Sequence, residues 1–273
     1  MFEAIFENVR QKSPLVLSVT NYVTANDCAN LLLACGASPV MTDEPEDAVE
    51  LAAACGGLHL NIGTLNQRTI PAMFAAGKRA RELGRPVVLD PVGAGATHLR
   101  TETASGLLRE VRPAVLRGNI SEIKALASGE SAARGVDADA ADQVTEDRLR
   151  EAVDFVKDFA RRTGAVIAVT GAVDLVADGE RAFCIRNGHP ILSAITGTGC
   201  QLSALTAAFA AANPDQLLEA TAAAVCAMGL CGEIAAGRLT REEGNASCRT
   251  YLIDAMYRLT PADLEQGARY EVR

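Results

Sequence analysis

Short apolar runs alternate with helical patterns along most of the chain, and this alternation limits the available folds more than any other feature. Continuous apolar runs at residues 14–19, 86–90 and 166–170 have the length and composition of strands buried on both faces. The helical patterns between such runs end at glycines such as Gly36 and Gly84, which are typical C-terminal caps. Buried strands joined by helices imply right-handed crossovers. The sequence therefore predicts an α/β fold with a mostly parallel central sheet and helices on both faces.

The chain is predicted to form a single domain over residues 1–273. Its 273 residues suffice for one large core, and neither a repeat nor a linker interrupts the pattern. Residues 129–147 are rich in Ala, Asp and Gly and predict an exposed, partly mobile loop. Asp178-Gly179 is a hairpin signal, so the last part of the sheet is expected to be antiparallel. The polar C-terminal tail, residues 262–273, is expected to fray.

Net charge and composition argue against nucleic acid and membrane as partners. The net charge is −8, and no basic stripe interleaved with aromatic residues is present, which argues against nucleic acid. The apolar runs are shorter than the ~18 residues that a membrane span needs. Residues 1–7 carry early acids and no basic region, so a secretory signal is not expected and a cytoplasmic protein is. A nearly apolar helical pattern at 214–236 is expected to be buried in the core or against another subunit.

The eight cysteines are spread along the chain, and their spacing is not that of a metal site. None belongs to a C-x-x-C pair, and the three histidines are scattered. This pattern argues against a zinc cluster, and without a secretory signal a disulfide framework is not expected either. Most of the thiols are therefore expected to be small core side chains in a reducing compartment.

The stretch Thr196–Cys200, with the sequence Thr-Gly-Thr-Gly-Cys, precedes an Ala-rich helical pattern. Gly197 and Gly199 let the backbone turn tightly and approach a ligand, because neither carries a Cβ. Free amides at the start of a helix, together with the helix dipole, favour an anion. The sequence predicts an anion hole with Cys200 at its rim, although a glycine-rich turn beside a buried thiol has the same pattern. The helix N-terminus is also expected to lower the pKa of Cys200.

Polar residues and glycines follow several of the predicted strands. In a mostly parallel sheet these positions share one edge, which is the edge where ligands bind. Each position alone is most simply a cap or turn residue, but together they predict a site. The positions are Thr20-Asn21, Met41, Gly63-Thr64, Asp90, Arg117-Gly118-Asn119 and Thr170-Gly171.

The chain has neither a Walker A motif nor a G-x-G-x-x-G motif, which argues against a P-loop enzyme and a dinucleotide-binding domain. What remains is the anion hole, the carboxylates Asp90 and Glu122, and the cations Arg117 and Lys124. Phosphoryl transfer needs such groups: donors for the migrating phosphate, acids for Mg²⁺ or its waters, and a cation for the triphosphate. Taken alone, Glu122 is more simply a helix cap.

Several motifs together carry a resemblance to a known family. Gly-Thr-Gly-Cys at 197–200 is the most specific of them. The others include Thr20-Asn21-Tyr22-Val23, Leu60-Asn61-Ile62-Gly63-Thr64-Leu65, Asp90-Pro91-Val92-Gly93-Ala94-Gly95-Ala96, Arg134-Gly135-Val136-Asp137, Val169-Thr170-Gly171 and Asn187-Gly188-His189-Pro190. From residue 13 to residue 260 the chain resembles the hydroxyethylthiazole kinases of the thiamine pathway, which belong to the ribokinase-like superfamily.

The resemblance implies a three-layer ribokinase-like fold, a homotrimer with sites between subunits, and a kinase reaction. In that reaction ATP, with Mg²⁺, phosphorylates the primary hydroxyl of 4-methyl-5-(2-hydroxyethyl)thiazole. The site residues that the resemblance implies are Met41 and Gly197 for the thiazole; Arg117 and Thr170 for ATP; Asp90 and, through a water, Glu122 for Mg²⁺; and Cys200 as the base. The shared sheet edge adds Asn21 and Gly63 to the expected thiazole site and Asn119 to the ATP site, and the anion hole adds Gly197 and Gly199 to the expected catalytic residues.

Some positions depart from the family pattern, and other functions stay open at this point. Ala172, Leu175, Gln201 and residues 248–250 differ from it, which affects the expected nucleotide contacts and the shape of the pocket. A kinase for another alcohol, such as hydroxymethylpyrimidine or pyridoxal, would have the same fold. A hydrolase or transferase with Cys200 as nucleophile would need a histidine base, and His189 is the nearest in sequence. A nucleotide sensor would bind ATP without turnover.

Overall fold

The computed structural model describes residues 1–128 and 144–273. Within these residues nine strands form one sheet in the order β2-β1-β3-β4-β5-β6-β7-β8-β9. The strand pairs from β2 to β6 are parallel and those from β6 to β9 are antiparallel, which confirms the predicted α/β class. The strands are β1 Leu15–Val19, β2 Ser38–Met41, β3 Gly57–Asn61, β4 Val87–Asp90, β5 Val115–Asn119, β6 Val166–Thr170, β7 Asp174–Ala177, β8 Ala182–Ile185 and β9 Tyr270–Val272.

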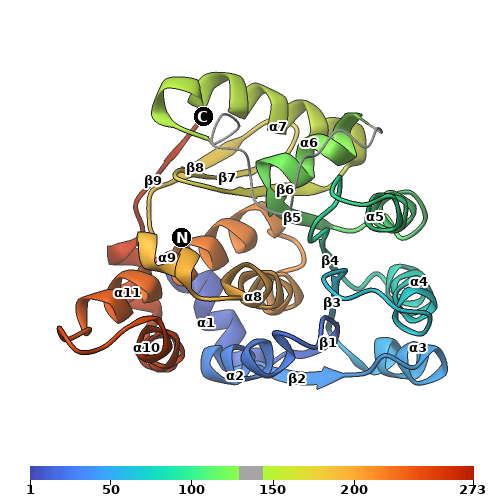
Figure 1. The fold of residues 1–273 in the computed structure, drawn as a ribbon, viewed down its shortest axis with the longest axis horizontal. Helices are drawn as coiled ribbons and strands as arrows, with labels where there is room; N and C mark the ends of the chain where they lie inside the picture. The colour runs from blue at the N-terminus through green and yellow to red at the C-terminus, as the bar shows by residue number, and fades with distance from the viewer. Residues whose placement is uncertain (129–143) are drawn as a thin grey trace.

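Helices cover both faces of the sheet and make three layers, as predicted (Figure 1). One outer layer holds α3 Pro45–Ala54, α4 Thr69–Glu82, α5 His98–Glu110, α6 Ile120–Ser128 and α7 Leu149–Thr163. The other holds α1 Phe2–Lys12, α2 Ala25–Cys35, α8 Thr198–Ala212, α9 Leu217–Gly237, α10 Asn245–Arg258 and α11 Pro261–Gly267. Successive strand residues point to opposite faces, so Val16 joins the core beneath α8 while Leu17 joins the core beneath α4.

Helices α8 and α9 form the centre of the second layer, and most of their residues are buried. By length and composition α9 could cross a membrane, but 72% of its apolar window is buried inside the protein. It packs against α8, α10 and the strands β6, β7 and β8. Of the two burial sites predicted for this apolar helix, the core of its own chain is the one observed.

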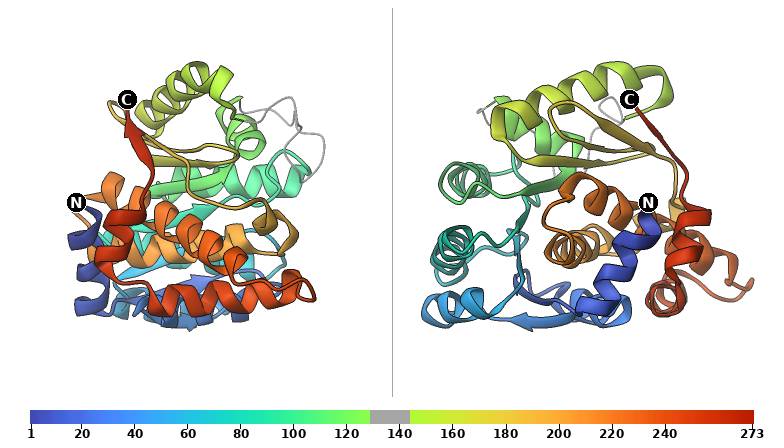
Figure 2. Two further views of the ribbon diagram at one scale, coloured as in Figure 1. Left: turned by 90° about the vertical axis from the view of Figure 1, so that its left-hand side faces the viewer. Right: turned by 180° about the vertical axis from the view of Figure 1, so that it is seen from behind.

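The predicted fraying of residues 262–273 is wrong. They form most of α11 and the strand β9, which pairs with β8 so that Val272 lies opposite Phe183. The ring centroid of Tyr270 lies 4.9 Å from that of Phe2 and 5.4 Å from that of Phe183. A few apolar side chains in a polar segment therefore hold it in place. Helix α1, which the sequence analysis did not identify, packs against α11 (Figure 2).

The two loop predictions have different outcomes. The hairpin at Asp178-Gly179 is confirmed, because it joins β7 to β8 and Asp178 Oδ1 accepts hydrogen bonds from the N–H groups of Glu180 (2.8 Å) and Arg181 (2.6 Å). Residues 129–143 of the predicted mobile loop, including the motif at 134–137, lie outside the described residues.

Candidate active site

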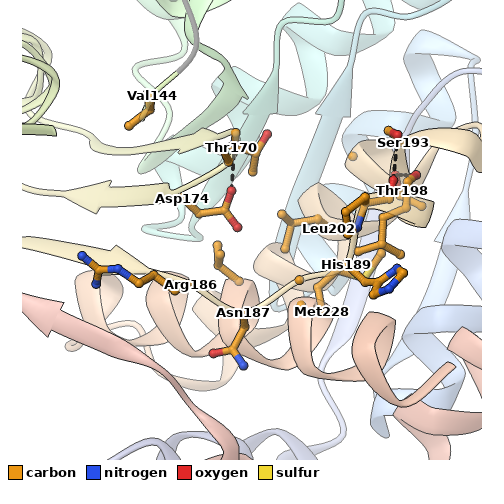
Figure 3. A pocket seen from close by; sticks show the side chains of 18 of the residues that line it. Val144, Thr170, Asp174, Arg186, Asn187, His189, Ser193, Thr198, Leu202 and Met228 are labelled. Atoms are coloured by element: carbon orange, nitrogen blue, oxygen red, sulfur yellow. Dashed lines mark hydrogen bonds between the residues drawn. The ribbon is translucent and has the colours of Figure 1, made fainter. Parts of the chain in front are cut away.

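The carboxyl ends of the central strands meet α8 and α9 at a pocket of about 640 Å³. Figure 3 shows the residues that line this space, which come from β6, β7, the segment after β8, and the two helices. A short 3₁₀ helix, η3 Pro190–Ala194, lies on one side of it. Residues of the pocket include Arg117, Thr170, Asp174, Thr198, Val225 and Met228. Its position agrees with the rule that ligands bind at the carboxyl edge of a parallel sheet.

The first turn of α8 faces the pocket with backbone donors that have no partner among the described residues. Gly197 is the N-cap residue, with φ of 82°, and no side chain within residues 1–128 and 144–273 caps the helix. The first backbone bond of the helix joins Gln201 N–H to Gly197 O at 2.9 Å. The N–H groups of Thr198, Gly199 and Cys200 precede that bond and point out of the helix. This geometry has the donors that the predicted anion hole requires.

Both glycines of this turn leave room for a neighbouring side chain. A Cβ on Gly197 would lie 2.2 Å from Thr24 Cγ2, and the positive φ also disfavours any other residue. A Cβ on Gly199 would lie 2.5 Å from Nη1 of Arg117. The guanidinium group therefore lies directly against the start of the helix. Its other nitrogen, Nη2, donates to Thr170 Oγ1 at 2.6 Å, which fixes the cation beside the free amides.

Asp90 ends β4 and is 1% exposed. Its Oδ2 accepts hydrogen bonds from Asn61 Nδ2 and Ser203 Oγ, each at 2.8 Å, and lies 3.7 Å from Nη1 of Arg117. Oδ1 is buried and has no hydrogen-bond partner within the described chain. Burial raises the pKa of the Asp90 carboxyl, and the neighbouring Arg117 charge opposes that rise.

Glu122 caps helix α6 and also lies near Asp90. Its Oε2 accepts from Asn119 N–H at 2.8 Å, and Asn119 Oδ1 accepts from Glu122 N–H at 2.9 Å, which is a reciprocal capping arrangement. Its Oε1 accepts from Gly93 N–H at 2.8 Å. Burial, reinforced by the Asp90 charge, raises the pKa of Glu122 to about 7. The cap interpretation therefore describes its contacts, and the amide oxygen of Asn119 is engaged in the same cap.

Cys200 lies at the rim of the anion hole and is 9% exposed. Its Sγ accepts a hydrogen bond from Asn21 Nδ2 at 3.3 Å. The expectation that the helix N-terminus lowers the pKa of this thiol is wrong. Burial raises the pKa of Cys200, and the nearby Asp90 carboxylate raises it further, so desolvation and like charge outweigh the helix dipole.

The residues expected at the thiazole site fall into two groups. Asn21 and Gly63 lie together, because both Asn21 Nδ2 and Gly63 N–H donate to Asn61 Oδ1 at 2.9 Å. Asn21 also reaches Cys200, which places this group beside the anion hole. Met41 lies further along the sheet edge, at the end of β2, with Ser18 of β1 opposite it.

Three residues of the site were missed as candidates. Asn61 ends β3, so the carboxyl-edge rule could have identified it. Ser203 lies inside α8, where no sequence signal separates it from a core serine. Asp174 begins β7, and its Oδ1 accepts from Gly171 N–H at 2.8 Å. Burial raises the pKa of Asp174 to about 7.

The residues that depart from the family pattern lie in different environments. Ala172 lines the pocket, whereas Leu175 is fully buried in the core beneath α7. Gln201 is fully buried too, and neither polar atom of its amide has a partner within the described residues. Cys248 is buried on α10. His189 lines the pocket, but its Nδ1 accepts from Ile191 N–H at 3.3 Å, and no hydrogen bond joins it to Cys200 in the part of the chain described.

Comparison with known sequences gives one family. The hydroxyethylthiazole kinase family matches residues 6–262 of the chain. The hydroxyethylthiazole kinase of Clostridium acetobutylicum is 54% identical over 271 residues, which cover 99% of each chain. That of Methanocella arvoryzae is 47% identical, with 97% of this chain and 96% of the relative covered.

Comparison with solved structures agrees. The hydroxyethylthiazole kinase of Pyrococcus horikoshii has a TM-score of 0.88 and 37% identity, with 100% of this chain and 98% of that one covered. A pyridoxal kinase of Staphylococcus aureus has a TM-score of 0.59 and 15% identity, with 95% and 98% covered, and shares the fold. The resemblance seen in the sequence is thus confirmed: the chain belongs to the hydroxyethylthiazole kinase family.

Proposed function

We propose that the protein phosphorylates the primary hydroxyl of 4-methyl-5-(2-hydroxyethyl)thiazole with ATP, in thiamine biosynthesis or salvage. The names and high identities of the relatives support the reaction. The observation that carries the proposal is the first turn of α8, where free amides face a guanidinium group held against Gly199. Donors arranged around a developing negative charge are the main requirement of phosphoryl transfer.

The two substrates are proposed to approach this turn from opposite sides. ATP lies in the 640 Å³ pocket, with its phosphates on Arg117 and Thr170 and its base near the apolar side chains of Val225 and Met228. Asn119 supports the phosphate end through the cap of α6. The thiazole alcohol lies on the side of Asn21, Gly63 and Met41, with its hydroxyl beside Cys200 and Gly197. The γ-phosphoryl group passes between them at the amides of Thr198–Cys200.

Cys200 is proposed to contact the acceptor hydroxyl without deprotonating it in advance. Because the pKa of its thiol is raised, the sulfur is protonated near neutral pH and is a poor base for an alcohol. In a loose, metaphosphate-like transition state the hydroxyl loses its proton late. Positioning of the hydroxyl and stabilisation of charge by the amides of Gly199 and Cys200 then contribute more than base strength.

Asp90 and Glu122 fit the Mg²⁺ that the family implies. The Oδ1 atom of Asp90 is buried without a partner among the described residues, and Asp90 raises the pKa of Glu122 by like charge. A divalent cation would relieve both costs, and carboxylate oxygens are its preferred protein ligands. Asp90 and, through a water, Glu122 are proposed to hold the ion, which when bound would offset the charge of the triphosphate.

The protein is also proposed to be a cytoplasmic homotrimer with sites between subunits. The support is an exposed apolar group directly after Asn21: Tyr22 is 81% and Val23 57% exposed, and Leu99 near the same surface is 55% exposed. Large apolar side chains gathered beside a binding site mark a surface that a partner covers. Helix α9 does not supply that surface, because its own chain buries it.

ADP release tests the proposed reaction. Purified protein would be incubated with ATP and Mg²⁺ and, separately, with hydroxyethylthiazole, hydroxymethylpyrimidine or pyridoxal. Turnover confined to the thiazole is expected. Turnover with another alcohol alone would contradict the substrate assignment while keeping the kinase chemistry, and binding of ATP without turnover of any alcohol would favour the nucleotide-sensor alternative.

A further inference from the structure

Two asparagine amides connect the Asp90 carboxylate to the Cys200 thiol. Asn61 Nδ2 donates to Asp90 Oδ2 at 2.8 Å, and Asn61 Oδ1 accepts from Asn21 Nδ2 at 2.9 Å. Asn21 Nδ2 also donates to Cys200 Sγ at 3.3 Å. All four side chains are buried or nearly so. The chain Asp90–Asn61–Asn21–Cys200, called the amide bridge below, therefore runs through a region from which water is largely excluded.

The direction of each amide is fixed by backbone groups that can only donate. Gly63 N–H donates to Asn61 Oδ1 at 2.9 Å, so the nitrogen of Asn61 must face Asp90. The N–H groups of Val23 (3.1 Å) and Thr24 (3.0 Å) donate to Asn21 Oδ1, so the nitrogen of Asn21 must face Asn61 and Cys200. Neither amide can turn over without placing a donor against a donor.

We propose that Asn61 is a positioning residue of the kinase reaction. It holds the side chains of Asn21 and Asp90 at a fixed distance from each other and thereby fixes the position of the Cys200 sulfur relative to the carboxylate. Asn61 joins the carboxylate end of the amide bridge to the rest of it, since it donates to Asp90 and accepts from Asn21. The inference rests on the proposed placement of the acceptor hydroxyl beside Cys200.

Gly63 supports the same interpretation on steric grounds. A Cβ at this position would lie 3.0 Å from Asn61 Oδ1 and 3.1 Å from Asn21 Cβ, which is tighter than most real contacts. The turn after β3 therefore leaves just enough room for its own N–H to bond to Asn61. The role of Gly63 near the substrate is then to orient the bridge, in addition to any direct contact with the thiazole.

The test is Asn61→Ala, with two readouts. Loss of a hydrogen bond to a charged group is expected to lower kcat about 10- to 100-fold, with the KM for ATP changed by less than about twofold. Loss of the acceptor for Asn21 frees its amide, so the donor to Cys200 Sγ is no longer held, and the hydrogen bond by which Asn61 itself lowers the pKa of Cys200 is lost as well. Alkylation of Cys200 by iodoacetamide, followed by mass spectrometry of its peptide, is expected to slow by about two- to tenfold.

Ser203→Ala is the matched control. Ser203 donates to the same Asp90 oxygen at 2.8 Å but does not contact Asn21 or Cys200 by any hydrogen bond in the described chain. It is expected to lower kcat and to leave Cys200 alkylation at the wild-type rate. Equal alkylation in Asn61→Ala and wild type, or equal slowing in Ser203→Ala, would overturn the proposal. So would a change confined to the KM for ATP.

Asn61→Ser covers the case in which Asn61→Ala does not fold, since a hydroxyl can take over one of the two bonds. Thermal melting by circular dichroism would accompany each variant. Because alkylation needs no substrate, it tests the amide bridge even if the wild-type protein fails to phosphorylate the thiazole. A wild type without turnover would count against the proposed function. A folded Asn61→Ser variant with both wild-type alkylation and wild-type kcat would count against the bridge, because its hydroxyl can keep only one of the two bonds.

Discussion

Gly199 determines how closely Arg117 approaches the free amides of α8. We expect Gly199→Ala to displace the guanidinium group, because the added Cβ would lie 2.5 Å from Nη1. The expected loss of kcat is on the order of 10²-fold or more, as for removal of a preorganised donor in other enzymes. Gly237→Ala is the control, since a Cβ there meets nothing within 4 Å and the position lies at the end of α9. Steady-state ADP release measures both.

Cys200→Ala, measured in the same assay, is expected to lower kcat by less than Gly199→Ala does. The raised pKa keeps the thiol protonated near neutral pH, so little thiolate is present to act as a base, and the amide N–H of residue 200 remains in the variant. Measurable turnover should therefore persist. If Cys200→Ala abolished turnover while Gly199→Ala retained most of it, the sulfur would be the chief catalytic group and the assignment of the anion hole would be wrong.

Asp174 makes stability depend on pH in a predictable direction. Its pKa of about 7 in the folded protein exceeds the usual 3.8, so the folded state binds the proton more tightly than the unfolded state. The resulting stabilisation is complete below pH ~4 and is lost as pH rises through ~7. Asp174→Asn keeps the acceptor for Gly171 N–H but cannot titrate.

Urea unfolding of wild type and Asp174→Asn at pH 5, 6.5 and 8 tests this sign. The free energy of unfolding of the wild type, relative to that of the variant, is expected to fall by roughly 2 kcal/mol across the range. A difference that stayed constant, or that grew with pH, would show that burial does not raise the pKa of this carboxyl.

Elements differ in how much of their structure the sequence reveals. The parallel strands were predictable because both faces are covered, so their residues form continuous apolar runs such as 86–90. Helix α1 was predictable as well, because Phe2, Ile5, Phe6 and Val9 recur at the spacing of an amphipathic helix. Strand β9 was not, because its side chains are only partly buried or exposed and lie among charged ones. In residues 262–273 only Leu264 is fully buried, and Tyr270 is partly so. Composition suggests a loose tail there, while packing against Phe2 makes an ordered one.

The residues of the candidate site also divide into those that the sequence predicts and those that it does not. Asn21, Asp90 and Thr170 were found because each ends or follows a parallel strand, and Arg117 because it lies two residues before the end of β5. Asp174 begins its strand, and it reaches the same edge only because β7 runs antiparallel to β6, a pairing that lies beyond local pattern. Hydroxyl side chains inside helices commonly bond to the backbone of their own helix. Nothing in the sequence therefore marked Ser203 of α8 as a hydrogen-bond donor to the Asp90 carboxylate.

The packing of strand β9 through Tyr270 predicts how much this strand contributes to the stability of the fold. Tyr270→Ala would remove ring contacts with Phe2 and Phe183 and is expected to lower the free energy of unfolding by about 1–3 kcal/mol. Tyr257→Ala is the control, because Tyr257 is 71% exposed and should stay within about 0.5 kcal/mol of wild type. Thermal melting checks both. Equal melting temperatures for the two variants would mean that the C-terminal strand contributes little to stability.

At the scale of the whole molecule, the exposed apolar group beside the site predicts assembly. Sedimentation is expected to give a trimer, and Tyr22→Asp is expected to shift it towards the monomer, since burying an unpaired carboxylate at an interface is unfavourable. Tyr257→Asp, on α10, should leave the trimer intact. A monomeric wild type, or loss of assembly in both variants alike, would contradict this location of the interface.

Helix α1 is synthesised long before the segments of the chain that bury it. The helices that cover it are α8, α9 and α11. Contacts between segments so far apart in sequence slow folding. Phe2, Ile5 and Phe6, which the finished fold buries, therefore stay uncovered through most of translation. A chaperone that attends the nascent chain would meet these side chains while they are still exposed.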